Sequence, residues 1–298
     1  MTAVLDCSIY RRHMALISVD ELARRIDTAD PQLVVFDSRF DLNDHGRGRR
    51  DFDDAHIPGA RFIDLHTELA ALDGSSTTGG GRHPLPRTAS FRAVLERHGV
   101  SRSSFVVVYD DSGGAIAARL WWMLRAIGHQ HVAVLDGGIP AWRAQEYPVT
   151  DEVTACEPTS YEVPEQWPGI VTADEIEPAI AQGRTVIDSR AAIRYRGESE
   201  PLDPRAGHIP GAVNLFHGGH LDVSGHHRPV AELRDRFASI DLGDQPIVYC
   251  GSGVTACHNL LVMCIVGLAE PGEALLYPGS WSEWSADTSR PTATGDRP

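Results

Sequence analysis

The chain has 298 residues, a length that suggests two domains of ordinary size, and its 42% hydrophobic and 23% charged residues are typical of a globular protein. Its formal net charge of −14 argues against partners such as nucleic acid or an anionic membrane surface. No apolar run of about 18 residues is present, so we expect no segment that crosses a membrane.

Residues 1–13 are expected to form an extension, because they precede the patterned part of the chain. They contain no apolar core of signal-peptide length before a cleavage site. Five cysteines, an odd number without framework spacing, indicate a reducing compartment, so we expect a cytoplasmic protein. No Cys-x-x-Cys pair occurs, and a zinc site is therefore not expected.

Residues 14–147 predict a first α/β domain. Ser18 lies three residues before Glu21 in SVDELARRI, a capping box that predicts the start of a helix. Short apolar runs follow at LVVFD (33–37), before Asp110 and before Gly137, and such runs are typical of buried parallel strands. The intervening loop LDGSSTTGGGRHPLP (72–86) is rich in glycine and serine, and we expect it near the surface.

Residues 170–298 repeat this pattern and predict a second domain, after a linker at 148–169 that contains four prolines. The matching segments occur in the same order in both halves: VVFDSRF (34–40) with TVIDSRA (185–191), HIPGA (56–60) with HIPGA (208–212), FRAVLERHGV (91–100) with AELRDRFASI (231–240), VVVYDDSGG (106–114) with PIVYCGSGV (246–254), and LDGGIPAW (135–142) with YPGSWSEW (277–284). Strands that alternate with helices predict two tandem α/β domains, each a parallel sheet with helices on both faces.

The duplication places Asp110 opposite Cys250, so only the second copy carries a thiol at the end of this strand. Ligands of open α/β sheets bind outside the carboxyl ends of the strands. Gly251, Ser252 and Gly253 allow a tight loop whose N–H groups, together with the helix expected from about Thr255, favour an anion. A thiolate there is a competent nucleophile.

The alternative is that Cys250 is a small buried residue that fills the core. Cys257 and Cys264 are seven residues apart on an apolar helix, and we interpret both as packing residues.

With its two HIPGA motifs, the CGSGVTA loop and GSWSEW, the chain resembles the two-domain rhodanese superfamily of sulfurtransferases over nearly its full length. The resemblance implies an inactive N-terminal domain, a catalytic C-terminal domain and a site between them. It also implies that the loop of Cys250, Gly251, Ser252, Gly253, Val254 and Thr255 aims its amides at the reacting sulfur and contacts the substrate.

The loop is neutral, and in this respect it resembles the 3-mercaptopyruvate sulfurtransferases, whereas thiosulfate-type rhodaneses carry basic residues just after the cysteine. Thiosulfate remains the alternative donor, because nearby arginines could hold a dianion. Phosphatase relatives have a longer loop that ends in arginine, and Val254, Thr255 and Ala256 supply none.

Two arginines are candidate partners for the donor carboxylate. By position after DSR, Arg194 resembles the substrate arginine of the family, and Arg205 resembles the second one. Guanidinium groups bind carboxylates bidentately, which suits this task. Arg190 and Arg196 have the alternative role of structural ion-pair partners.

Ser252 is a candidate for bonding the substrate carbonyl or the leaving enolate, and its alternative role is that of a small loop residue. Related mercaptopyruvate enzymes have an Asp–His–Ser arrangement, of which His56 and Ser252 match two members. No aspartate matches the third position in register.

The resemblance implies a double displacement. Cys250 takes sulfur from a small anionic donor as a persulfide, and a thiol such as reduced thioredoxin or a small thiol, or cyanide in an assay, removes it. This chemistry requires neither a metal nor an organic cofactor. The alternative from another class is a sulfur-carrier or regulatory binding module with little turnover.

Overall fold

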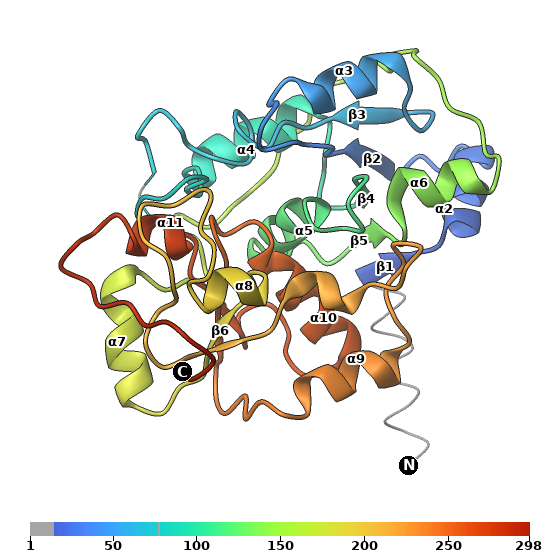
Figure 1. The fold of residues 1–298 in the computed structure, drawn as a ribbon. Coiled ribbons are helices and arrows are strands. Elements are labelled where there is room, and N and C mark those ends of the chain that lie inside the picture. Colours follow the sequence, from blue (N-terminus) through green and yellow to red (C-terminus); the bar gives the residue numbers. More distant parts are fainter. Residues whose placement is uncertain (1–14, 77) are drawn as a thin grey trace.

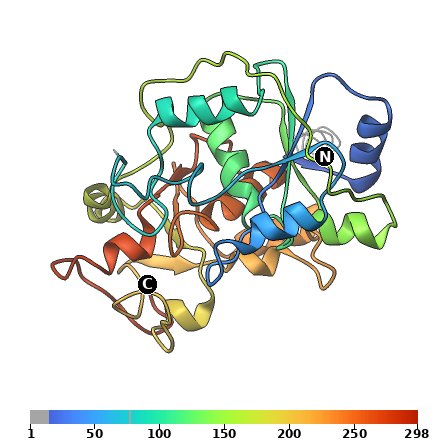
Figure 2. The same cartoon turned by 90° about the horizontal axis from the view of Figure 1, so that it is seen from above.

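The computed structural model of the chain describes residues 15–76 and 78–298 (Figure 1). The predicted extension at 1–13 lies outside these residues. We call residues 15–147 the N-terminal half and residues 170–298 the C-terminal half. Each half contains one parallel sheet, and the two sheets lie side by side with helices between and around them (Figures 1 and 2).

The N-terminal half has a five-stranded parallel sheet in the order β1-β5-β4-β2-β3. Its strands are β1 (Leu16–Ile17), β2 (Leu33–Asp37), β3 (Ala60–Phe62), β4 (Phe105–Tyr109) and β5 (Val132–Leu135). Its helices are α2 (Val19–Asp27), α3 (Arg47–Asp54), α4 (Thr88–Arg97), α5 (Ala117–Ala126) and α6 (Gly138–Ala144).

The C-terminal half repeats this plan with a four-stranded parallel sheet in the order β7-β6-β8-β9. Its strands are β6 (Val186–Asp188), β7 (Ala212–Asn214), β8 (Ile247–Tyr249) and β9 (Leu275–Leu276). Its helices are α7 (Ala173–Ala181), α8 (Ala192–Tyr195), the 3₁₀-helix η1 (His217–His220), α9 (Val230–Phe237), α10 (Ala256–Val266) and α11 (Ser280–Trp284).

Helices cover both faces of each sheet, as the sequence predicts. Along β4, Val106 and Val108 pack toward α4 and α5, whereas Val107 and Tyr109 pack toward α2, α3 and α6. Successive side chains of a strand point to opposite faces, so a strand covered on both sides must be apolar throughout.

The first helix of each half begins at the predicted residue, with a full capping box at Thr172 and a side-chain N-cap at Ser18, where the Glu21 carboxylate bonds Arg24 and Arg25 instead. The Ser18 side chain accepts a hydrogen bond from the Glu21 amide, and the Thr172 amide donates to the Glu175 carboxylate over 2.7 Å. These side chains satisfy amides that a helix start leaves without partners.

A single apolar core joins the two halves. Helix α5 of the N-terminal half packs against α10 of the C-terminal half. Both helices are almost wholly buried, and most of their residues are apolar. The packing of α5 against α10 fixes how the carboxyl ends of the two sheets face each other.

Part of the segment predicted as a linker packs against the N-terminal half. Trp167 is 5% exposed and its indole N–H donates to the carbonyl of Pro86 over 2.6 Å, and Tyr161 bonds His129 over 2.8 Å. No helix or strand is assigned between 151 and 169, all of which the structure describes. Within the described residues, no helix combines the length and the apolar character needed to cross a membrane.

Candidate active site

Cys250 follows β8 directly and carries a free thiol that is almost fully buried. The Gly253 amide donates to the Sγ of Cys250 over 3.2 Å, and the amide of Cys250 donates to Ser280 Oγ over 3.1 Å. Ser280 has a left-handed backbone (φ 54°), an unusual conformation for a residue with a side chain. The thiol is therefore held between the 251–255 loop and the start of α11.

Gly253 is required by this geometry. Its φ is 74°, and a Cβ at this position would lie 2.4 Å from the carbonyl oxygen of Pro278. Only glycine tolerates both the conformation and the close approach of the backbone. The N–H of Gly253 is thereby aimed at the sulfur.

The twin loop of the N-terminal half shows which ligand such a loop suits. The Asp110 carboxylate accepts hydrogen bonds of 2.8–2.9 Å from the amides of Ser112, Gly114, Ile116 and Ala117. Burial raises the pKa of Asp110, while these four amides act in the opposite direction. A loop of this shape therefore offers several N–H groups to one negative charge at the end of the strand.

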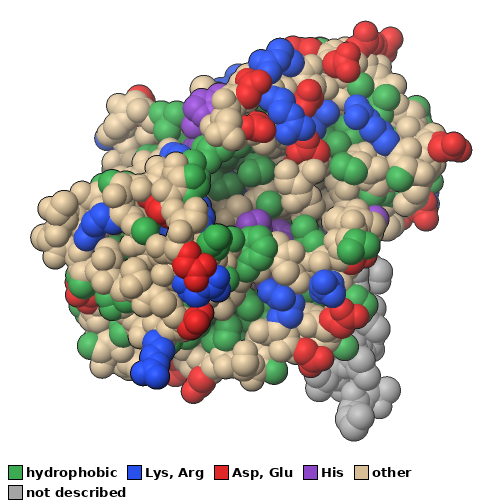
Figure 3. Space-filling view, in the orientation of Figure 1, with side chains coloured by type: hydrophobic (Ala, Val, Ile, Leu, Met, Phe, Trp, Pro, Cys, Tyr) green, Lys and Arg blue, Asp and Glu red, His purple; other side chains and the backbone are tan. Residues whose placement is uncertain are grey.

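A cavity of about 330 Å³ opens onto Cys250 between the two halves. Figure 3 shows the hollow between them on this face of the molecule. The C-terminal half contributes Arg190, Ala191, Arg194, Leu202, Phe216, His217, Cys250, Gly251, Ser252, Val254 and Thr255, and the N-terminal half contributes Phe40, Leu42, Leu65, Arg82, His83 and Ile116.

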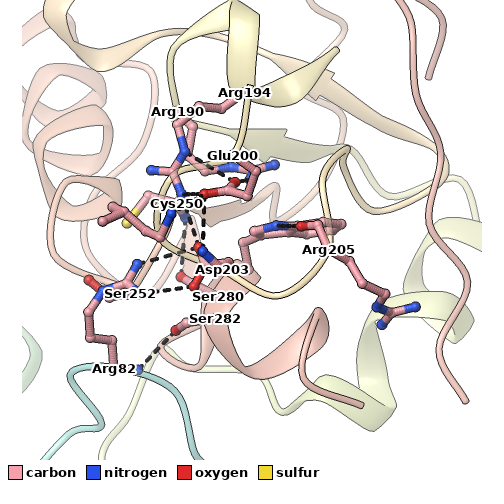
Figure 4. Close-up of polar contacts among 12 residues, drawn as sticks. Arg82, Arg190, Arg194, Glu200, Asp203, Arg205, Cys250, Ser252, Ser280 and Ser282 are labelled. Atoms are coloured by element: carbon pink, nitrogen blue, oxygen red, sulfur yellow. Dashed lines mark hydrogen bonds and ion pairs between the residues drawn. The ribbon is translucent and has the colours of Figure 1, made fainter. Parts of the chain in front are cut away.

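Arg194 lies at this cavity, in α8. Its guanidinium donates to Glu200 over 2.6 Å and to Asp203 over 2.9 Å (Figure 4). Both of these bonds use Nη2. A Cβ on Gly251 would lie 3.5 Å from Nη1, so the other edge of the guanidinium faces the 251–255 loop.

Arg82 is a cavity residue that sequence reasoning missed. It comes from the N-terminal half and donates to Asp203 over 2.9 Å. A Cβ on Gly251 would lie 3.4 Å from its Nη2. The loop at 72–86 places it there, because the Arg82 amide donates to Ser282 Oγ and the Gly80 amide to the Glu283 carboxylate. The expectation that this loop lies near the surface is wrong for residues 83–86, which are buried.

Ser252 contacts His83, a histidine of the N-terminal half. Its Nδ1 lies 2.9 Å from Ser252 Oγ, in a hydrogen bond, and its Nε2 is buried without a partner among the described residues. Burial lowers the pKa of His83 to about 3, helped by the nearby His66 and Arg119. The imidazole is therefore neutral at physiological pH.

The structure does not bring His56 to Ser252. His56 stacks on Phe52, with ring centroids 3.8 Å apart, and its two nitrogens bond the carbonyls of Phe52 and Glu152. Its twin His208 stacks on Tyr195 and bonds two carbonyls in the same way. Since both copies use this histidine to tie the start of the HIPGA segment to backbone carbonyls outside it, we assign His56 a structural role.

Arg205 is not placed at the cavity either. Its guanidinium donates to the carbonyls of Trp284, Ser285, Asp287 and Arg290, and Figure 4 shows it pointing away from Cys250. These bonds satisfy carbonyls at and beyond the end of α11, which would otherwise lack partners.

Arg190 has the structural role that the sequence left open. It donates to Asp188 over 2.6 Å and to the Gly207 carbonyl over 2.6 Å, and its twin Arg39 bonds Asp37 and the Ala55 carbonyl. Arg190 also lies at the cavity wall, where it bonds Glu200.

Arg119 connects the 251–255 loop to the N-terminal half, and the sequence analysis did not identify it. It is fully buried in α5, and its guanidinium donates to the carbonyls of Gly253, Leu69 and His83. Burial raises the pKa of the neighbouring Cys257 thiol to about 12, which fits a packing role for that cysteine. No sequence motif marks Arg119, because it lies within an apolar helix.

Comparisons with known proteins show the family of this chain. A family model described as a rhodanese-like domain matches residues 18–145 and 172–287. The chain is 41% identical over 286 residues to a probable 3-mercaptopyruvate sulfurtransferase of Pseudomonas aeruginosa, covering 94% of this chain and 98% of the relative. It is 39% identical over 294 residues to a putative thiosulfate sulfurtransferase of Mycobacterium tuberculosis, covering 95% and 98%.

The human 3-mercaptopyruvate sulfurtransferase is 36% identical over 280 residues, which cover 91% of each chain. Among solved structures, a 3-mercaptopyruvate sulfurtransferase from Leishmania major matches with a TM-score of 0.80 and 30% identity, covering 92% of this chain and 75% of that one.

Proposed function

This chain belongs to the rhodanese family of sulfurtransferases, and from that premise we propose that it transfers sulfur from 3-mercaptopyruvate to a thiol through a persulfide on Cys250. The observation that carries the proposal is the placement of the free Cys250 thiol. It lies at a cavity with an amide aimed at its sulfur and two guanidinium groups beside the adjoining Gly251.

In the first half-reaction, the Cys250 thiolate attacks the sulfur of 3-mercaptopyruvate. A sulfur–sulfur bond forms, the carbon–sulfur bond breaks, and its electron pair leaves as the enolate of pyruvate, which takes up one proton to give pyruvate. This is nucleophilic catalysis with a covalent intermediate. The Gly253 amide and the other amides of residues 251–255 stabilise negative charge on the sulfur.

The donor carboxylate is held by Arg194 and Arg82. One edge of each guanidinium faces Gly251, and the two arginines come from different halves of the chain. Such a pair orients a carboxylate so that the sulfur two carbons away points at Cys250. Arg82 thus takes the role that sequence reasoning assigned to Arg205.

Ser252 and His83 act on the leaving enolate. The hydroxyl lies on the catalytic loop and is bonded to a neutral imidazole, so the pair can donate a hydrogen bond to the substrate carbonyl as charge develops on it. Val254 and Thr255 line the cavity and exclude water from it.

In the second half-reaction, an acceptor thiolate attacks the outer sulfur of the persulfide and restores the Cys250 thiolate. Reduced thioredoxin, a small thiol or, in an assay, cyanide would serve. An odd cysteine count without framework spacing supports a reducing compartment, and we propose the cytoplasm.

Thiosulfate is the second candidate donor. The same two arginines offer donors to a dianion, and a relative of high identity carries the name putative thiosulfate sulfurtransferase.

The test is steady-state sulfur transfer to cyanide with both donors in parallel, on the wild type and on Cys250→Ser. We expect a much higher kcat/KM for 3-mercaptopyruvate, lost in the variant. A preference for thiosulfate would reject the assigned donor, normal turnover by Cys250→Ser would reject the nucleophile, and no turnover with either donor would favour a sulfur-carrier module.

A further inference from the structure

We propose that Asp203 determines which sulfur donor the site accepts: its buried carboxylate, shared by the two cavity arginines, favours a singly charged donor over a dianion such as thiosulfate. This inference rests on the proposed function and concerns the same cavity.

Asp203 joins the two halves at the cavity wall. Its Oδ1 accepts from Arg82 Nη1 and its Oδ2 from Arg194 Nη2, each over 2.9 Å (Figure 4). The side chain is only 2% exposed, so solvent screens its charge little. Both guanidinium groups are thus already paired with one carboxylate before any donor binds.

The ion-paired side chains around Asp203, which form this wall of the cavity, have no net charge. Its positive groups are Arg82, Arg190 and Arg194, and its negative groups are Asp188, Glu200 and Asp203, with carboxylate side chains that are 0%, 3% and 2% exposed. Three positive and three negative charges sum to zero. A second negative charge on the donor therefore gains no net attraction from these six paired groups, and the nearby Arg119 guanidinium is already bonded to the carbonyls of Gly253, Leu69 and His83.

The hydrogen-bond donors that remain suit one carboxylate. Among the described residues, Nη1 of Arg194 donates to no partner, and it lies with Arg82 Nη2 beside Gly251. Asp203 accepts from Arg194 Nη2 and Arg82 Nη1 over 2.9 Å each and from Arg82 Nη2 only over 3.4 Å, so Arg194 Nη1 and the weakly bonded Arg82 Nη2 remain for the donor. Removal of its negative charge would give the wall a net charge of +1 and free further N–H groups for a dianion.

Glu200 is less suited to this role although it also bonds Arg194. Its carboxylate accepts from the amides of Leu202 and Asp203 and from Arg190, so it shapes the loop itself. The Asp203 carboxylate bonds the side chains of Arg82 and Arg194, whereas the Glu200 carboxylate also bonds backbone amides. A change of charge at Asp203 should therefore disturb the backbone less than one at Glu200.

The experiment measures kcat/KM for 3-mercaptopyruvate and for thiosulfate, with cyanide as acceptor, in the wild type and in Asp203→Asn. We expect the ratio of thiosulfate to 3-mercaptopyruvate to rise about tenfold or more in the variant, mainly through a lower KM for thiosulfate. Higher ionic strength should reduce this gain.

Two variants serve as controls. Asp203→Glu keeps the negative charge, so its donor ratio should stay near that of the wild type. Glu198→Gln makes the same change in net charge on the same loop, but Glu198 is 53% exposed and pairs with Arg196, so the donor ratio should not move.

The inference fails if Asp203→Asn transfers sulfur through Cys250 with an unchanged or lower ratio, or if Glu198→Gln raises the ratio as much. These outcomes differ from a failure of the proposed function, in which the wild type itself would not use 3-mercaptopyruvate. A folding defect of Asp203→Asn would lower kcat/KM for both donors by the same factor, so the ratio still reports the change in donor preference.

Discussion

At the scale of single residues, the contact between Ser252 and His83 makes a prediction about the first half-reaction. Ser252→Ala and His83→Phe should each lower kcat with 3-mercaptopyruvate by roughly 10–100-fold. The first variant removes the hydroxyl that donates to the developing enolate, and the second removes the imidazole that positions this hydroxyl. Removal of sulfur from a preformed persulfide by cyanide should change little. Single-turnover kinetics of the two half-reactions would separate these effects.

The same pair has a pH signature. Burial lowers the pKa of His83 to about 3, so the imidazole stays neutral from pH 8 down to about pH 5. The wild type and His83→Phe should therefore show the same pH dependence of kcat over this range, with different magnitudes. An inflection near pH 6.5 that only the wild type shows would contradict a neutral His83.

The sequence predicts those site residues that lie together in one short motif. Cys250 and Ser252 were found because the loop, its glycines and its Asp110 twin lie within one short segment. Arg82 and His83 could not be found in this way, because only the packing of the two halves brings them to a loop some 170 positions later. The prediction for His56 is wrong for a related reason, since one of the two carbonyls that it bonds belongs to Glu152, 96 positions later in the chain.

At the scale of elements, the segment at 79–83 is positioned by its contact with α11. Gly81 has φ 91°, and a Cβ there would lie 2.5 Å from the carbonyl oxygen of Gly279. Gly81→Ala should displace this segment and with it Arg82 and His83. We expect KM for 3-mercaptopyruvate to rise about tenfold or more and kcat to fall.

Gly74→Ala is the matched control. Gly74 lies in the same loop with φ 75°, but a Cβ there meets nothing within 4 Å. Gly74→Ala imposes backbone strain similar to that of Gly81→Ala but no clash. It should therefore lower the free energy of unfolding by about 1 kcal/mol and leave KM nearly unchanged. If both variants behaved alike, the contact with α11 would not be what positions the arginine.

The elements themselves were largely predictable. The N-cap at Ser18, the capping box at Thr172 and the strands before Asp110 and Cys250 appear where the sequence indicates. The loop at 72–86 was harder, because glycine and serine indicate freedom of the chain but not what the chain contacts. Its last residues are buried through contacts far apart in sequence, because His83 bonds Ser252 and the Pro86 carbonyl accepts from Trp167.

At the scale of the whole molecule, the repeated segments predict two similar domains, and the structure adds that they share one core through α5 and α10. Five histidines in and around this core have pKa values below the usual 6.5 because burial disfavours their charged forms. They are His83 and His220 (pKa about 3), His129 and His217 (pKa about 4), and His258 (pKa well below 6.5).

These histidines predict a loss of stability in mild acid. Below pH 6.5 the unfolded chain binds protons that the folded chain does not, so their contribution is complete above about pH 6.5 and is lost as the pH falls toward 4. The loss approaches 1.4 kcal/mol per histidine for each pH unit below 6.5. Urea unfolding at pH 7.5 and at pH 5.5 measures it.

His129→Gln is the control for this prediction. His129 bonds Tyr161 away from the cavity, so the variant removes one titrating group and should make the pH dependence shallower by about one proton. A free energy of unfolding that stays level between pH 7.5 and 5.5 would contradict the buried, neutral histidines.

The central claim is that Cys250 receives the sulfur of 3-mercaptopyruvate. The most direct measurement is the mass of the intact protein after one equivalent of 3-mercaptopyruvate without an acceptor, followed by peptide mapping. We expect one added sulfur atom on the peptide that contains Cys250, its loss on adding cyanide, and no addition to Cys250→Ser. Sulfur found on another cysteine, or none on the wild type while turnover proceeds, would contradict the account.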